Sequence, residues 1–132
     1  MDSQRYHSGT EWEDKANYRR AVRRGQHVFV SGTTAMRRHD LVGEGDVTAQ
    51  ARFVFKKIGL SLAAVGAQLS DVVRTRLYIT NVEHADAVIA VHAEAMQAAL
   101  PAATLVVVKA LIDPRLLVEI EVDAIVTEES GV

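Results

Sequence analysis

The sequence lacks cysteine altogether and has only two prolines among its 132 residues. Without cysteine the chain can form no disulfide, thiolate nucleophile or Cys-ligated metal site, and it is compatible with a reducing compartment. No segment approaches the ~20 consecutive apolar residues that a membrane-spanning helix needs. The first residues, Met1-Asp2-Ser3-Gln4-Arg5, lead into no apolar run. We therefore expect no signal peptide, no membrane partner and a cytoplasmic location.

Neither sign of charge dominates, because 15 Lys and Arg residues face 17 Asp and Glu residues for a formal charge of -2. Such a balance gives no overall attraction to nucleic acid or to an anionic membrane. The hydrophobic share of 48% supports an ordinary packed core. The length fits a single domain over residues 1–132. Within it, residues 1–17 are expected to form a polar segment with Trp12 as its one large anchor, and residues 127–132 a frayed tail.

Hydrophobic periodicity predicts five strands and two helices. Period-two alternation indicates strands at 18–24 and 27–34, and Gly25-Gln26 between them suits a type II′ hairpin turn. Asp46 can cap a first helix through Val65, after a loop at 35–46. Asn81 can cap a second helix through about Ala99. Further strands are predicted at 72–79, 104–109 and 117–126. The order β-β-α-β-α-β-β describes an α+β fold, a mixed sheet with two helices on one face.

The strand predicted at 104–109 indicates that the chain forms an oligomer. Its run Leu105-Val106-Val107-Val108 is apolar on both faces, and such runs are normally buried on both sides. Two helices cover only one face of a sheet, so a second copy of the chain is the simplest cover for the other face. The alternative is that the N-terminal segment folds under the sheet.

Several short motifs between residues 17 and 126 resemble, in the same order, those of the RidA (YjgF) family of reactive-intermediate deaminases. They are Asn17-Tyr18-Arg19-Arg20-Ala21-Val22, Val28-Phe29-Val30-Ser31-Gly32-Thr33, Asp46 to Arg52, Ser70 to Thr75, Tyr78 to Asn81, Pro101-Ala102 and Val118-Glu119-Ile120-Glu121. The resemblance implies a chorismate-mutase-like, ferredoxin-related fold. It also implies a homotrimer whose sheets pack into a central barrel, with small-molecule clefts at the subunit interfaces.

Catalytic members of this family hydrolyse reactive imines and enamines, such as 2-aminoacrylate, to keto acids and ammonia without a metal or an organic cofactor. By resemblance, Glu119 would position or activate water as the catalytic residue. The implied ligand-binding residues are Tyr18, Ser31, Gly32, Ala103, Thr104 and His92. At the position of Ala103 the family carries an arginine, whose planar guanidinium holds a substrate carboxylate by two parallel hydrogen bonds.

Because Ala103 lacks that group, we expect little standard 2-imino acid deaminase activity and a less acidic ligand, of imine, enamine or carbonyl type. Arg20, Arg37 and Arg76 are the arginines that could replace the clamp in space. A non-catalytic module that binds a small ligand or a protein is the alternative function. RNA binding or endoribonuclease activity is a weaker alternative, because strand alternation splits the arginines at 19–24 between two faces and no aromatic platform accompanies them.

Structural interpretations compete with these site assignments. Glu119, Glu121 and Asp123 alternate on one strand face, where they could form an ion-pair ladder with Arg74 and Arg76. Tyr18 could close a barrel end, and His92 could be a core histidine with one satisfied hydrogen bond. The spacing of the five histidines fits no metal site.

Overall fold

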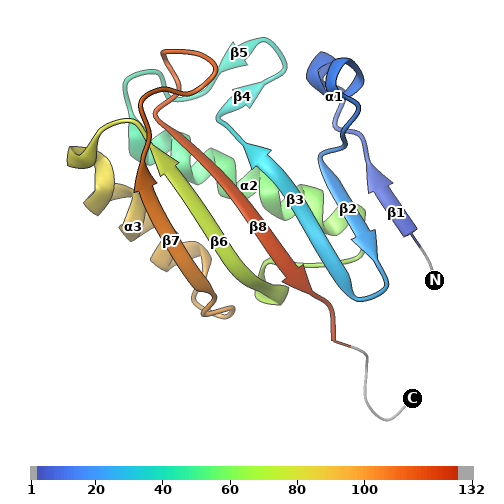
Figure 1. The fold of residues 1–132 in the computed structure, drawn as a ribbon. Coiled ribbons are helices and arrows are strands. Elements are labelled where there is room, and N and C mark those ends of the chain that lie inside the picture. The colour runs from blue at the N-terminus through green and yellow to red at the C-terminus, as the bar shows by residue number, and fades with distance from the viewer. Residues whose placement is uncertain (1–2, 128–132) are drawn as a thin grey trace.

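A six-stranded sheet with two helices packed on one face forms the centre of the computed structural model, which describes residues 3–127 (Figure 1). The strand order across the sheet is β1-β2-β3-β8-β6-β7. Neighbouring strands are antiparallel except β6 and β7, which are parallel. The strands are β1 (Ser3–Tyr6), β2 (Ala21–Arg24), β3 (His27–Thr33), β6 (Val72–Ile79), β7 (Ala102–Val107) and β8 (Val118–Ile125). The α+β class and the mixed sheet are therefore confirmed.

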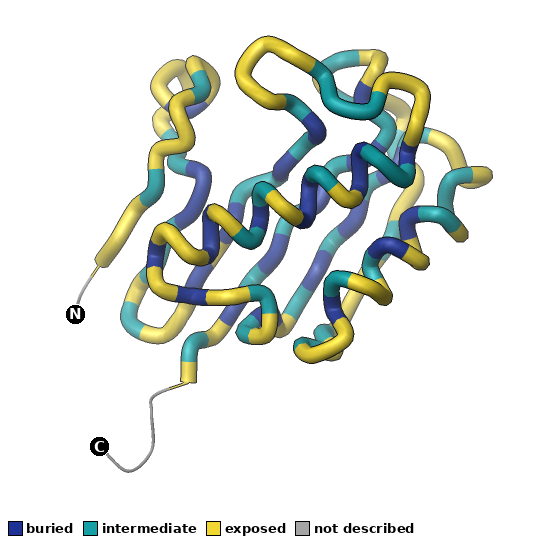
Figure 2. The backbone as a smooth tube through the Cα atoms, turned by 180° about the vertical axis from the view of Figure 1, so that it is seen from behind, coloured by how far each residue is buried: buried dark blue, intermediate teal, exposed yellow. Residues whose placement is uncertain are grey.

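The helices of this layer are α2 (Val47–Ala64) and α3 (Ala85–Ala95), and their inner faces bury the core against the sheet (Figure 2). Val54, Ile58 and Leu62 on α2 are fully buried, as is Ile120 on β8. Burying each such side chain stabilises the fold by roughly 1.5–3 kcal/mol. Among the described residues, no helix is both long enough and apolar enough to span a membrane.

Two local signals act as the sequence indicated. Gly25 has a positive φ of 58° while Gln26 does not, which is the pattern of a type II′ turn between β2 and β3. At the start of α2 the Asp46 carboxylate accepts a hydrogen bond from the amide of Ala49 at 3.0 Å. A further set of contacts was not predicted. The buried Gln50 side chain donates hydrogen bonds to two backbone carbonyls and accepts one from the amide of Leu117 at 2.9 Å. It fixes α2 to the segment before β8.

Some boundaries differ from the prediction. The second helix ends at Ala95 rather than near Ala99, and a 3-10 turn, Val82–His84, precedes it. Strand β7 begins at Ala102 because it pairs with β6 from Arg74 onward, so the predicted strand at 104–109 lay two residues too late. The loop at 35–46 contains a small hairpin of β4 (Met36–Arg37) and β5 (Asp40–Leu41).

The N-terminal segment is more ordered than its polar composition suggested. It contributes strand β1, which pairs with β2, and a short helix α1 (Glu11–Ala16) at that edge of the sheet (Figure 1). Trp12 is 50% exposed, so it is not the expected anchor. The buried residue of α1 is Glu13. Of the tail expected to fray, residues 128–132 lie outside the described residues.

Because β1 extends the sheet edge, the N-terminal segment does not fold under the sheet. The face opposite α2 and α3, here called the open face, therefore carries exposed apolar side chains on three strands. Phe29 on β3 is 49% exposed, Val106 on β7 41% and Ile125 on β8 39%. They are spread over the face, since Phe29 pairs with Asp123 and Val106 with Tyr78. Neither α2 nor α3 covers this face, which leaves it available for contact with another copy of the chain.

Candidate functional site

The open face carries the acidic side chains of β8. Pairing of β8 with β6 sets Glu119 beside Tyr78 and Glu121 beside Arg76. Arg76 lies 3.4 Å from Glu121 and 3.3 Å from Asp123, and the Tyr78 hydroxyl donates to Glu121. The ion-pair ladder thus exists for Glu121 and Asp123. Glu119 takes part in none of the side-chain hydrogen bonds or ion pairs found within residues 3–127.

Glu119 lies against the backbone of β3, where the strand register shifts between Val30 and Thr33. A Cβ atom at Gly32 would overlap Glu119 Oε2 and stand 3.0 Å from its Cδ, so only glycine leaves room for the carboxylate here. Burial raises the pKa of Glu119, the nearby Arg20 guanidinium opposes that rise, and the charge of Glu121 adds to it. An unpaired, part-buried carboxyl with a raised pKa is suited to proton transfer.

Arg20 joins the other residues of this region. Its guanidinium donates to the Gly32 carbonyl at 2.5 Å, to Thr33 Oγ1 at 3.4 Å and to the Tyr18 hydroxyl at 3.3 Å. The whole residue is only 7% exposed. Tyr18, Arg20, Gly32 and Glu119 therefore form one connected group, here called the Glu119 cluster.

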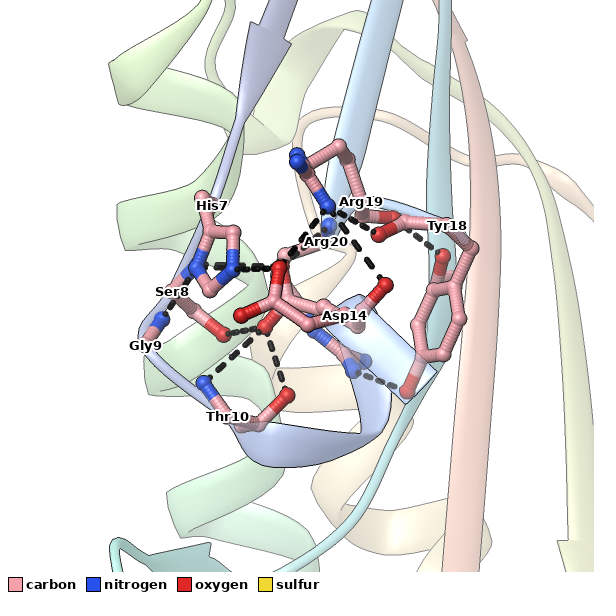
Figure 3. Close-up of polar contacts among 10 residues, drawn as sticks. His7, Ser8, Gly9, Thr10, Asp14, Tyr18, Arg19 and Arg20 are labelled. Atoms are coloured by element: carbon pink, nitrogen blue, oxygen red, sulfur yellow. Dashed lines mark hydrogen bonds and ion pairs between the residues drawn. The ribbon is translucent and has the colours of Figure 1, made fainter. Parts of the chain in front are cut away.

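A buried carboxylate in α1 holds the backbone of Arg20, a member of this cluster. Glu13 accepts hydrogen bonds from the backbone and hydroxyl of Ser8, from those of Thr10 and from the amide of Arg20. Figure 3 labels these three partners. Burial alone would raise its pKa, but the hydroxyls and then the amides of Ser8 and Thr10 lower it to about 2. Sequence reasoning missed this residue. The signal was Thr10-x-x-Glu13, the pattern of a helix capping box.

A second charged side chain fixes the segment that follows β3. Lys57 on α2 donates to the carbonyls of Thr34 at 2.9 Å and Met36 at 2.8 Å. Burial lowers the pKa of Lys57 to about 8, the positive charge of Arg20 adds to this, and Glu13 opposes it. The ammonium group is thus held by backbone carbonyls beside the Glu119 cluster.

Tyr18 and Ser31 line a hollow of about 470 Å³ at the same end of the sheet. The other lining residues are Arg5, Asn17, Arg19 and Val22. Arg19 donates to the Tyr18 carbonyl at 2.9 Å and lies 3.6 Å from Asp14. Ser31 Oγ donates to the Arg19 carbonyl at 2.7 Å. The predicted residues Tyr18, Ser31, Gly32 and Glu119 are therefore neighbours, and Arg5 is a lining residue that the sequence did not indicate.

The remaining predicted residues surround a different space, here called the Ala103 pocket. It measures about 230 Å³ between β7 and α3, and is lined by Leu77, Ile89, His92, Ala103, Thr104 and Leu105. His92 Nε2 lies 2.8 Å from Thr75 Oγ1, and the imidazole meets the Phe55 ring edge-on with centroids 6.0 Å apart. Burial lowers the pKa of His92. One ring nitrogen of His92 thus has a hydrogen-bond partner, as the core interpretation predicted. The residue also lines the pocket.

Comparison with known proteins decides the family. The model of the family described as Endoribonuclease L-PSP matches residues 9–126. The chain belongs to this family.

Its relatives carry the YjgF and Rid names of the predicted resemblance. The chain is 43% identical to Rv2704 from Mycobacterium tuberculosis, of the YjgF/YER057c/UK114 family, with a TM-score of 0.87 over 95% of this chain and 100% of that one. It is 32% identical to the Rid protein YyfA from Yersinia pestis, with a TM-score of 0.77 over 83% and 87%. It is also 38% identical to the uncharacterized protein SCO2049 from Streptomyces coelicolor, over 91% and 90% of the two chains.

In this L-PSP family member the residues of the implied site are divided between two places. Ala103 pairs with Thr75 on β6, whereas Glu119 pairs with Tyr78, three residues further along that strand. Three residues of strand span roughly 10 Å. The two side chains also lie on opposite faces, because Ala103 shares the helix side with Thr75. One chain therefore does not bring Ala103 and His92 to Glu119.

The three arginines considered as replacements for the family clamp lie in different surroundings. Arg76 is paired with the acids of β8. Arg37 stacks over Phe53 at 5.1 Å. Arg20 lies beside Glu119, yet its guanidinium already donates to Gly32, Thr33 and Tyr18. Only Arg20 belongs to the Glu119 cluster, and most of its donors are occupied.

Proposed function

We propose that this L-PSP family protein binds a small imine-, enamine- or carbonyl-type metabolite in a cleft between copies of the chain, and hydrolyses it when it contains a C=N bond. The observation that carries the proposal is the division of the implied site. The Glu119 cluster and the Ala103 pocket can share a ligand only if a neighbouring copy supplies one of them. The exposed apolar residues of the open face support association, and the family resemblance favours a homotrimer.

Glu119 is the residue that would carry the hydrolysis. Its carboxylate would take a proton from a water molecule while the water oxygen bonds to the carbon of the protonated imine. The π electrons of the C=N bond would become the lone pair of the nitrogen, which gives a neutral carbinolamine. The protonated Glu119 would then give its proton to the nitrogen, and ammonia would leave with the C–N bond electrons. As the hydroxyl oxygen forms the C=O group, its proton would return to the Glu119 carboxylate and pass on to water. A raised pKa suits a group that must hold this proton between the two steps.

The guanidinium groups near the cleft indicate which ligand charge the site can stabilise. A carboxylate that leaves water is best stabilised by a bidentate guanidinium partner. Ala103 offers none, and Arg20 is engaged by Gly32, Thr33 and Tyr18. Of the arginines that line the hollow beside Tyr18, Arg19 is held by Asp14 and by backbone carbonyls, and Arg5 is exposed and donates to Ser3. We therefore propose that neutral imines and carbonyl compounds are preferred over 2-imino acids.

The arginines do not favour RNA as the substrate. Arg20 is buried, and Arg23 donates to the Val65 carbonyl at the end of α2 at 2.9 Å. Arg19 is held by Asp14 and by backbone carbonyls. These side chains stabilise the fold instead of forming a continuous basic surface for phosphates.

Two measurements test the proposal. Light scattering should give three times the mass of one chain, and the mass of a single chain would remove the shared cleft. Ammonia release should then be followed from a neutral imine, made in place from 3-methylbutan-1-amine by an amine oxidase with catalase. We expect acceleration that Glu119→Gln reduces at least tenfold, while the exposed control Glu94→Gln leaves it unchanged. Stabilisation by 3-methylbutanal without any acceleration would show a non-catalytic module.

A further inference from the structure

The Ala103 pocket is lined by residues of β6 and β7 on one side and of α3 on the other. Parallel pairing places Ala103 beside Thr75 and Leu105 beside Leu77 on the helix side of β7. Ile89 and His92 face it from α3. Because position 103 carries only a methyl group, about 230 Å³ remains unfilled at this edge of the sheet.

The chemistry of the wall is apolar with a small polar part. Leu77, Ile89, Ala103 and Leu105 contribute hydrocarbon, and the residues that line the pocket include no Arg, Lys, Asp or Glu. An anion placed here would lose its hydration without gaining a counter-charge, which is costly. An apolar group would be stabilised instead, because its burial removes hydrocarbon surface from water.

His92 supplies the polar part. Its Nε2 is engaged by Thr75 Oγ1 at 2.8 Å, and burial lowers its pKa, which favours the neutral imidazole. Nδ1 takes part in no hydrogen bond among residues 3–127. A neutral imidazole with one free nitrogen can make a single hydrogen bond to a carbonyl, imine or hydroxyl group without adding charge.

The size of the pocket limits what it can take. Liquid water occupies about 30 Å³ per molecule, so the pocket accommodates a group of roughly six to eight heavy atoms. That is smaller than a typical drug-sized site. A branched alkyl chain of four or five carbons with one polar atom fits both the volume and the wall.

We infer that the Ala103 pocket binds the uncharged, branched-alkyl part of a small carbonyl or imine ligand, with His92 as its polar contact. The inference rests on the proposed function, because it names the class of ligand that the shared cleft takes. It makes residue 103 a specificity-determining position, where alanine selects for neutral ligands.

Two probes that differ at one group test it. In 4-methylpentan-2-one a methyl group stands where 4-methyl-2-oxopentanoate has its carboxylate. Titration of the full chain, followed by methyl NMR, should shift Ala103 and Ile89 with the ketone, at a Kd at least tenfold below that of the keto acid. Ala103→Leu should abolish the shifts by filling the pocket. Ala90→Leu, an exposed position of α3, should keep the Kd within twofold.

A second substitution at position 103 tests the preference for an uncharged ligand. Ala103→Arg should reverse the preference, so that the keto acid binds tighter than the ketone, whereas Ala90→Arg should not. Equal binding of both probes at Ala103 and Ile89 in the natural protein would overturn the inference, as would unchanged ketone binding in Ala103→Leu. If no ketone binds while Glu119-dependent ammonia release persists, the inference fails and the proposed function stands. Ketone binding here without such release supports the pocket and contradicts hydrolysis.

Discussion

Replacing Glu13 by glutamine tests how much of the fold depends on a single buried carboxylate. Glu13 is fully buried and accepts all its hydrogen bonds from N–H and O–H donors. Glutamine has nearly the same shape but turns one acceptor oxygen into an NH₂ donor. The backbone amides of Ser8, Thr10 and Arg20 cannot reverse their direction, so at least one of them must lose its partner.

The magnitude follows from the pKa of Glu13. Its value of about 2 in the folded protein, against an ordinary 4.5, corresponds to about 3 kcal/mol of stability at neutral pH. Because the folded-state pKa is depressed, this contribution is fully present above the unfolded pKa and is lost as pH falls from 4.5 towards 2. We therefore expect Glu13→Gln to lower the free energy of unfolding by about 3 kcal/mol at pH 7, and by progressively less below pH 4.5.

Urea unfolding at fixed protein concentration, followed by the fluorescence of Trp12, measures both effects. Glu11→Gln is the matched control, because Glu11 lies on the same helix, is 65% exposed and forms an ion pair with Lys15 at 3.8 Å. Such a surface pair contributes at most about 1 kcal/mol. A Glu13→Gln loss no larger than that of the control, or one that does not shrink in acid, would refute the reasoning.

Two further substitutions probe the surroundings of Glu119. Gly32→Ala should displace the Glu119 carboxylate at a cost of about 1 kcal/mol, because the overlapped atoms end a flexible side chain. Carboxyl ¹³C NMR should show the raised pKa of Glu119 moving towards its ordinary value, whereas Gly59→Ala on α2, which has room for a Cβ, should leave it unchanged. Lys57→Met should remove a pH dependence: the folded protein releases the Lys57 proton near pH 8 and the unfolded chain near 10.5, so the natural protein gains stability over that range. Urea unfolding at pH 7.5 and 9.5 compares the two proteins, and a constant difference would show that this amine is unperturbed.

Periodicity was enough to predict the central layer. Alternation and helical spacing found β6 with its exact bounds and the start of α2, because burial against a single core imposes one pattern on each element. The same signal failed for residues 3–16. There the buried group is Glu13, and hydrogen bonds rather than hydrophobic contacts fix it, so α1 and β1 left no apolar pattern to detect.

The candidate site was predictable only in its parts. Resemblance named Glu119 and Ala103 together, but neighbouring motifs say nothing about which face of a sheet each side chain occupies. The pairing of β7 with β6 decided that, and it depends on contacts between residues far apart in the sequence. The sequence likewise did not indicate that Arg20 links Tyr18 to Gly32, because an arginine in a predicted strand usually points into solvent.

Strand β1 has a practical consequence for handling the protein. It pairs with β2 from Ser3 onward and carries Arg5 into the wall of the hollow beside Tyr18. Ser3 pairs with Arg24, Arg24 with His27 and His27 with Ile125, so β1 begins and β8 ends at the same end of the sheet (Figure 1). Within β8, Glu119 lies near the start of the strand and Ile125 at its end. Because β1 carries a residue of the hollow and β8 reaches Glu119 only at its far end, tags for ligand-binding assays belong after β8.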